Sequence, residues 1–219
     1  MEQTLFALLK EGAPLKPVDM GDFARVDKNG LHFQLECWQA GDLGQLSRVK
    51  MTGMLGLMKM ETLVFTPLTV DAPLYSFDYI HAMGQDTLLL ELYDTQLGIF
   101  DGTPWTEVLK QGETLPDNRL EPRWYDGLKL SPTLSKKGKK LKAPMEALAQ
   151  GWTKVYMEEL KKAPACEIAQ KREKVGAYVQ GLLTKGGPSV NQFKKLIGEE
   201  AAEELFSRYI FPAKDCQRQ

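Results

Sequence analysis

The stretch of residues 57–79 constrains the fold of this chain more than any other part of the sequence. It consists of two runs rich in apolar, β-branched and aromatic residues, separated by a link that contains two prolines: LMKMETLVFTPLTVDAPLYSFDY. Runs of this composition favour β-strands, and proline at their borders predicts an irregular turn between them. The stretch therefore predicts two neighbouring strands.

Each of these two strands carries one carboxylate among bulky neighbours. Because side chains alternate between the two faces of a strand, Glu61 shares a face with Leu63 and Phe65, and Asp78 shares a face with Ile80. Two interpretations follow. Both acids lie on a solvated sheet face, or both point into a cleft where loss of solvent raises the carboxyl pKa into the range useful for proton transfer. The spacing alone does not choose between them.

Length and charge suit a single domain that spans residues 1–219. The chain has 219 residues and a formal net charge of −1, a balance that argues against nucleic acid or an anionic membrane as the main partner. The sequence contains no long apolar run, and its first residues lack the basic flank of a signal peptide. We therefore expect a cytoplasmic protein.

The cysteines and histidines argue against the commonest bound metals. Cys37, Cys166 and Cys216 are widely spaced with no CxxC pair, and His32 and His81 are the only histidines. A disulfide framework or a zinc site is not expected from this set. The chain also lacks GxGxxG and Walker motifs, so the familiar glycine-rich nucleotide and flavin sites have no support.

The order of elements predicts an α+β domain. Alternating patterns predict further strands at residues 31–38, 45–52 and 87–93, and close spacing predicts an antiparallel meander. Helical periodicity predicts helices at residues 4–10, 105–111, 143–160, 166–183 and 189–209, with an otherwise irregular segment at residues 98–130. Strands followed by helices indicate a sheet that helices cover.

Residues 136–142, KKGKKLK, form the one concentrated basic run. Two interpretations are open: a solvated, mobile loop, or a surface that attracts an acidic protein or the carboxylates of a ligand.

Two stretches together resemble the ferredoxin-dependent bilin reductases and their relative, red chlorophyll catabolite reductase. Residues 57–80 resemble the family's strand ending in Phe and Pro, its short link, and its Pro-containing strand that leads to an Asp. Residues 178–211, YVQGLLTKGGPSVNQFKKLIGEEAAEELFSRYIF, are similar to the closing helix of the family. Between them Trp124, SPTLSKK and VYMEEL stand in family order.

The resemblance implies a three-layer α/β/α sandwich with a central antiparallel sheet, and a tetrapyrrole between that sheet and the C-terminal helices. It implies reduction of CH–CH groups in a linear tetrapyrrole such as biliverdin, by a radical mechanism in which a reduced [2Fe–2S] ferredoxin supplies single electrons. No bound metal or flavin is needed, since the chemistry resides in the pigment. We expect a monomer whose basic run docks ferredoxin or a similar acidic donor.

The same resemblance assigns roles to two acids. Asp78 matches the central aspartate that exchanges protons with the lactams of the pigment. Glu61 stands where reductases that make phycocyanobilin carry a histidine, so we expect it to be an auxiliary acid. Thr52 replaces a glutamate of those enzymes, and Gly187 and Pro188 replace an acidic and a basic residue.

Five further residues are expected to contact the pigment. Lys136 or Lys137 would lie near a propionate, where a lysine acts as a point charge. Phe65, Ser76 and Tyr178 would line the pocket, although aromatic residues at such positions are more often ordinary core.

Two other functions fit the same residues. One is a tetrapyrrole-binding protein without reductase activity, which the changes at Thr52 and Gly187 suggest. The other is a reductase of a chlorophyll catabolite or of another open-chain fragment derived from haem or a corrin, which the substitution at Glu61 suggests.

Overall fold

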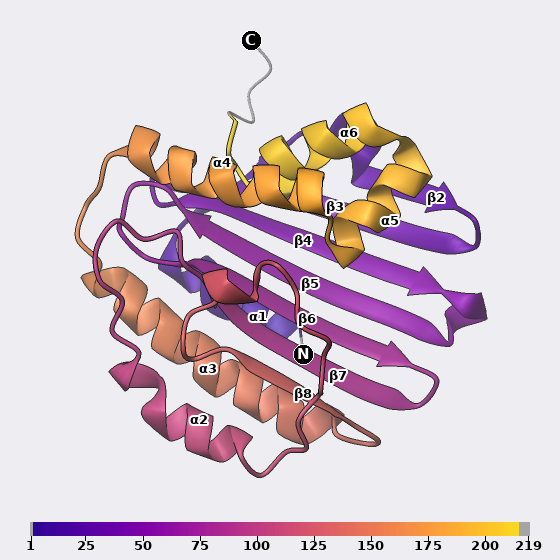
Figure 1. Ribbon diagram of the computed structural model, residues 1–219, viewed down its shortest axis with the longest axis horizontal. Helices are drawn as coiled ribbons and strands as arrows, with labels where there is room; N and C mark the ends of the chain where they lie inside the picture. The colour runs from indigo at the N-terminus through magenta and orange to yellow at the C-terminus, as the bar shows by residue number, and fades with distance from the viewer. Residues whose placement is uncertain (1, 215–219) are drawn as a thin grey trace.

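A computed structural model describes residues 2–214 and contains one antiparallel sheet (Figure 1). The sheet has eight strands in the order β1-β3-β4-β5-β6-β7-β8, and β2 pairs with the remaining part of β3. The strands are β1 (Leu15–Val18), β2 (Arg25–Lys28), β3 (Leu31–Ala40), β4 (Gly44–Gly53), β5 (Met58–Pro67), β6 (Leu74–Ala82), β7 (Gln85–Tyr93) and β8 (Leu134–Gly138). The predicted α+β class with an antiparallel sheet is confirmed.

Helices cover both faces of this sheet (Figure 1). Buried residues of α1 (Glu2–Gly12), α2 (Thr106–Gly112) and α3 (Lys142–Lys162) pack on one face, here called the α3 face. Buried residues of α4 (Ile168–Lys185), α5 (Pro188–Ile197), α6 (Glu199–Glu204) and the π-helical turn Leu205–Ile210 pack on the other, here called the α4 face. No helix in the described part of the chain is long and apolar enough to span a membrane.

The alternation of β6 shows how the sequence supplies two cores. Tyr75 and Phe77 point to the α3 face and are completely buried, whereas Leu74 belongs to the core on the α4 face. A strand covered on both sides needs apolar residues at nearly every position, and most of β6 and residues 88–90 of β7 meet that need. Asp78 interrupts this pattern on the α4 face.

Three short strands and one helix break differ from the sequence prediction. β1, β2 and β8 have only four or five residues each, too few for a clear alternation. β8 includes the first three residues of the basic run, so the interpretation of that whole run as a loop is wrong. The helix predicted for residues 189–209 divides at Gly198, whose φ of 89° ends α5.

The cysteines do not form a disulfide within residues 2–214. Cys37 is buried in the core on the α4 face, and Cys166 is partly exposed. Cys216 lies outside the described residues. Within that part of the chain, no three His, Cys, Asp or Glu side chains gather as a metal site.

A buried lysine stabilises the junction between α4 and the sheet. The Lys171 ammonium is completely buried and donates to the backbone oxygens of Ala72 and Thr95, each at 2.7 Å, while the Asp71 carboxylate lies 3.7 Å away. Burial lowers the pKa of Lys171.

Replacing Lys171 by Met is expected to lower the free energy of unfolding by about 3 kcal/mol. The change leaves two buried carbonyl oxygens without a donor and the Asp71 carboxylate without its cation. Urea denaturation measures the loss, and Lys161→Met, at an exposed lysine of α3, serves as the control. Equal stability of the two variants would show that Lys171 does not hold this junction.

Candidate functional site

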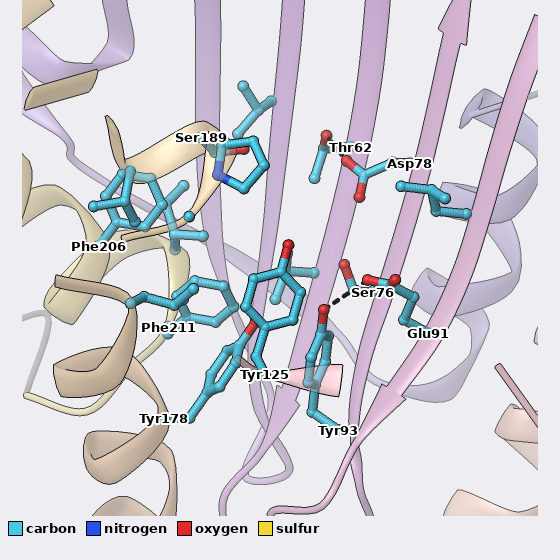
Figure 2. Close-up of a pocket in the computed structure, with 18 of the residues that line it drawn as sticks. Thr62, Ser76, Asp78, Glu91, Tyr93, Tyr125, Tyr178, Ser189, Phe206 and Phe211 are labelled. Atoms are coloured by element: carbon cyan, nitrogen blue, oxygen red, sulfur yellow. Dashed lines mark hydrogen bonds between the residues drawn. The ribbon is translucent and has the colours of Figure 1, made fainter. Parts of the chain in front are cut away.

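A pocket lies between the α4 face of the sheet and the C-terminal helices (Figure 2). Its cavity volume is about 220 Å³, somewhat below the range of roughly 300–1,000 Å³ that is usual for ligand sites, and it opens to solvent at its mouth. The residues that line it come from β4, β5, β6, β7, the segment before β8, and the helices: Val49, Met60, Thr62, Val64, Ser76, Asp78, Ile80, Leu89, Glu91, Tyr93, Arg123, Tyr125, Tyr178, Leu182, Gly187, Pro188, Ser189, Val190, Phe193, Phe206, Ile210 and Phe211.

The two walls of the pocket differ in chemistry. The helical wall is mainly apolar and aromatic, with Tyr178, Phe206 and Phe211 facing the sheet in Figure 2. The sheet supplies the acidic groups Asp78 and Glu91 from adjacent strands. An apolar cavity with a few convergent polar groups is the usual form of a small-molecule site.

Asp78 is the most perturbed acid in this pocket. It faces Thr62 across β5 and β6, and the Thr62 hydroxyl donates a hydrogen bond to its carboxylate. Burial is the largest influence and raises the pKa of Asp78 to about 6, with a further rise from Glu91. The Thr62 hydrogen bond and the charge of Arg123 oppose this rise. Asp78 can therefore hold and release a proton near neutral pH.

Glu91 is the second acid of the pocket, and the sequence analysis missed it. The register places Glu91 opposite Ser76, so it lies diagonally across from Asp78 on the α4 face. Its carboxylate accepts a hydrogen bond from the Tyr93 hydroxyl at 2.6 Å and pairs with the Lys129 ammonium at 2.8 Å. Alternation within residues 87–93 placed Glu91 on one face, but only the register shows which face that is.

Arg123 brings positive charge to the pocket. Among the described residues that line it, Arg123 is the one cation, and its guanidinium donates to the Tyr125 hydroxyl at 2.5 Å. Arg123 and Tyr125 belong to the irregular segment predicted at residues 98–130, which has no periodicity. No sequence pattern could place them.

Glu61 and Phe65 lie on the wrong face for the roles predicted for them. Glu61 pairs with Tyr79 in the register, so it points to the α3 face, as does Phe65, which is buried in the core there. Asp78 pairs with Thr62 and points to the α4 face. The prediction that Glu61 and Asp78 share a cleft is therefore wrong, because their positions differ by one residue in register and hence by one face.

The two lysines predicted near a propionate also lie outside the pocket. Lys136 is buried on the α3 face, where its ammonium pairs with Asp117 at 2.6 Å and donates to the Leu115 oxygen at 3.2 Å. Lys137 is exposed on the edge strand and is absent from the pocket lining.

Ser76 and Tyr178 do line the pocket together with Asp78, as do Gly187 and Pro188 at the start of α5. Thr52 pairs with Lys59 and lies on the α3 face, away from the pocket. The structure therefore brings together one of the two predicted acids and two of the five predicted contact residues.

Comparison with known proteins identifies the fold. No protein-family model matches the chain, and no curated protein matches it. Among solved structures, phytochromobilin synthase from tomato in complex with biliverdin matches with a TM-score of 0.73 and 14% sequence identity, over 100% of this chain and 86% of that one. The resemblance to the ferredoxin-dependent bilin reductases is confirmed at the level of structure: this chain has the fold of a ferredoxin-dependent bilin reductase.

Proposed function

We propose that this protein binds a linear tetrapyrrole in the pocket and reduces it with electrons from a reduced [2Fe–2S] ferredoxin. One observation carries the proposal: Asp78, with a pKa raised to about 6, lies in the wall of a mainly apolar pocket. The fold is shared with a protein whose solved structure contains biliverdin, which supports a ligand of the same class. The chain would act as one domain and as a monomer.

The chemistry asks little of the protein beyond protons and positioning. Reduction of one double bond of a bilin consumes two electrons, which ferredoxin delivers singly, and two protons. Asp78 in its protonated form would donate a proton to the pigment, and protonation makes the pigment a better electron acceptor. An acid with a pKa near the working pH suits this step.

The other polar groups of the pocket would orient the pigment and tune Asp78. Glu91 takes the place of Glu61 as the companion acid, and its charge is balanced by Lys129 at 2.8 Å. Arg123 takes the role assigned to Lys136 and would attract a propionate carboxylate of the ligand.

Replacing Glu61 by Gln is expected to leave turnover within about twofold of the wild-type rate. Glu61 lies on the opposite face of the sheet from the pocket, so its charge neither contacts the pigment nor supplies a proton. Steady-state rates with biliverdin measure this, with Glu91→Gln as the matched change inside the pocket. A large loss for Glu61→Gln and none for Glu91→Gln would contradict this arrangement.

Ligand binding tests the pocket itself. Ser189 is exposed at the start of α5 and lines the pocket, so Ser189→Trp is expected to obstruct it and weaken biliverdin binding at least tenfold. The measurement is an absorption titration of biliverdin. Lys195→Trp, at an exposed position of the same helix outside the pocket lining, is the control and should bind like wild type. Equal affinity of both variants would place the pigment elsewhere.

A second candidate is a tetrapyrrole-binding protein without reductase activity. Gly187 and Pro188 line the pocket where a reductase of this fold would offer an acidic and a basic residue, so the wall of α5 provides no ionisable group there. Binding of biliverdin without conversion under reducing conditions would favour this candidate. Conversion of another open-chain tetrapyrrole, but not of biliverdin, would show that the protein is a reductase with a different substrate.

A further inference from the structure

Two hairpin turns at one end of the sheet project large apolar side chains into solvent. Leu55 is fully exposed, Met83 is 77% exposed, and Met54 and Leu57 are also exposed. These four residues are here called the hairpin-tip patch. Most large apolar side chains of a soluble domain are at least partly covered, so a group of four exposed ones at one end of the fold points to a contact surface.

The two turns lie side by side. Met58 pairs with Ala82 in the register of β5 and β6, and the Met83 amide donates to the Leu57 oxygen at 3.4 Å. Figure 1 shows both turns on the right of the sheet, at the ends of β4 and β5 and of β6 and β7. The hairpin-tip patch is therefore one surface made by two connections.

The backbone of the patch adopts conformations that its side chains disfavour. Met54, Leu55 and Met83 have φ angles of 50°, 55° and 51°, in the left-handed region that glycine and asparagine adopt most readily. An exposed apolar side chain gains nothing from the core to offset this strain. Stability of the fold therefore does not account for apolar residues at these positions.

Lysines border the patch on two sides. Lys59 follows the first turn on β5, while Lys139 and Lys140 lie in the connection from β8 to α3, and all three are exposed. The register brings this connection next to the second turn, because Gly138 pairs with Asp86. The Asp86 carboxylate accepts hydrogen bonds from the Tyr79 hydroxyl and the Leu141 amide, and it is nearly buried, so it adds little negative charge to the surface.

The patch is continuous with the floor of the pocket. Met60 on β5 and Ile80 on β6 line the pocket, are partly exposed, and lie on the same two strands as the turns. Met83 lies three positions beyond Ile80 in the sequence, which corresponds to about 10 Å along a strand. A protein bound at the patch would therefore lie close to a pigment in the pocket.

We propose that the hairpin-tip patch and its lysine border form the docking surface for the acidic iron–sulfur electron donor. This inference rests on the proposed function and deepens it, because it names where the electrons enter. An apolar centre with a cationic rim complements a donor that carries acidic groups around its own apolar contact. This surface differs from the whole basic run, because Lys136 is buried and paired with Asp117 and only Lys139 and Lys140 of the run belong to the rim.

Variants can remove the patch without disturbing the fold. Leu55→Asn with Met83→Asn removes two apolar side chains and places at both sites a residue that tolerates a left-handed backbone. The control is Ile99→Asn, because Ile99 is fully exposed and lies in the connection that follows the opposite end of β7. A second variant, Lys139→Glu with Lys140→Glu, reverses the rim charge, and Lys154→Glu with Lys161→Glu is its control on the exposed side of α3.

The experiment measures the affinity of each protein for a plant-type [2Fe–2S] ferredoxin, together with its affinity for biliverdin. We expect the asparagine double variant to bind ferredoxin at least tenfold more weakly, with an equal or higher Tm. The charge-reversal variant should bind about fivefold more weakly at low salt, with a flatter salt dependence. Both controls, and every biliverdin affinity, should match wild type.

Three results would overturn the docking surface. They are unchanged ferredoxin affinity in both patch variants, no ferredoxin binding by the wild-type protein, and patch-dependent binding to phosphatidylserine vesicles with unchanged ferredoxin affinity. The last result would assign the patch to a membrane surface. Failure of the proposed function is distinguishable, because the wild-type protein would then fail to bind biliverdin, or would bind it without conversion by any reductant.

Discussion

Asp78→Asn is expected to keep biliverdin affinity within about threefold of wild type and to lower turnover by about 10²–10⁴-fold. Asparagine has the shape of aspartic acid and can still accept the hydrogen bond from Thr62. It cannot release a proton to the pigment. Anaerobic single-turnover kinetics with reduced ferredoxin measure the rate, and absorption titration measures the affinity. Turnover at the wild-type rate would remove Asp78 from the mechanism.

The pH dependence of the same two proteins separates a proton donor from a merely structural aspartate. With a pKa of about 6, the protonated fraction of Asp78 falls as pH rises through 6, and tenfold per unit above it. The wild-type rate should therefore fall between pH 6 and pH 8. The residual rate of Asp78→Asn should not show this fall.

The raised pKa of Asp78 also links stability to pH. Its folded value of about 6 lies above the ordinary value of 3.8, so the folded state binds the proton more tightly than the unfolded state. The contribution to stability is complete below pH 3.8 and is lost as pH rises through 6, by up to about 3 kcal/mol. Denaturation of wild type and Asp78→Asn at pH 4 and pH 7 should show the difference between them change by about 2.4 kcal/mol, which is most of this amount.

Lys129→Met is expected to lower the free energy of unfolding by about 3–5 kcal/mol. The Lys129 ammonium pairs with Glu91 and with Asp126, each at 2.8 Å, and the Lys129 and Glu91 side chains are only 12% and 8% exposed. Removing the cation leaves the buried Glu91 carboxylate, beside Asp78, with only the Tyr93 hydrogen bond and the charge of Arg123 to offset it. Urea denaturation at pH 7 measures the loss.

A double variant tests whether the loss comes from the stranded charge of Glu91. Lys129→Met combined with Glu91→Gln should recover most of the stability, because the buried negative charge is then absent. Equal stability of the single and double variants would contradict this assignment. Glu107→Gln, in an exposed ion pair with Lys110, is the matched control and should change stability by less than about 1 kcal/mol.

The sequence was sufficient to predict the long strands and helices, but not to predict which face of the sheet each side chain occupies. Long alternating runs predicted β3 to β7, and helical periodicity predicted α3 and α4, since these elements bury a full stripe or face. The short strands β1, β2 and β8 are held by pairing with their neighbours rather than by their own pattern. No local signal marks such strands.

The lack of information on sheet faces also explains why the site could be predicted only in part. Asp78 stands out in the sequence because an acid interrupts an apolar strand, and the structure places it in the pocket. Its companion could not be chosen, because Glu61 and Glu91 are both acids in neighbouring strands and only the register separates their faces. Arg123 comes from an irregular segment whose path depends on tertiary contacts. A position in such a segment is set by the whole fold.

The most direct test of the proposed function is an anaerobic absorption time course of the purified protein with biliverdin, reduced [2Fe–2S] ferredoxin and a system that regenerates the reductant. We expect a shift of the long-wavelength band on mixing, followed by a slower conversion that requires ferredoxin and the Asp78 carboxyl group. A shift without conversion would contradict the reductase and favour a binding protein or a different tetrapyrrole. The absence of any shift would show that this protein shares the fold of the bilin reductases but does not bind biliverdin.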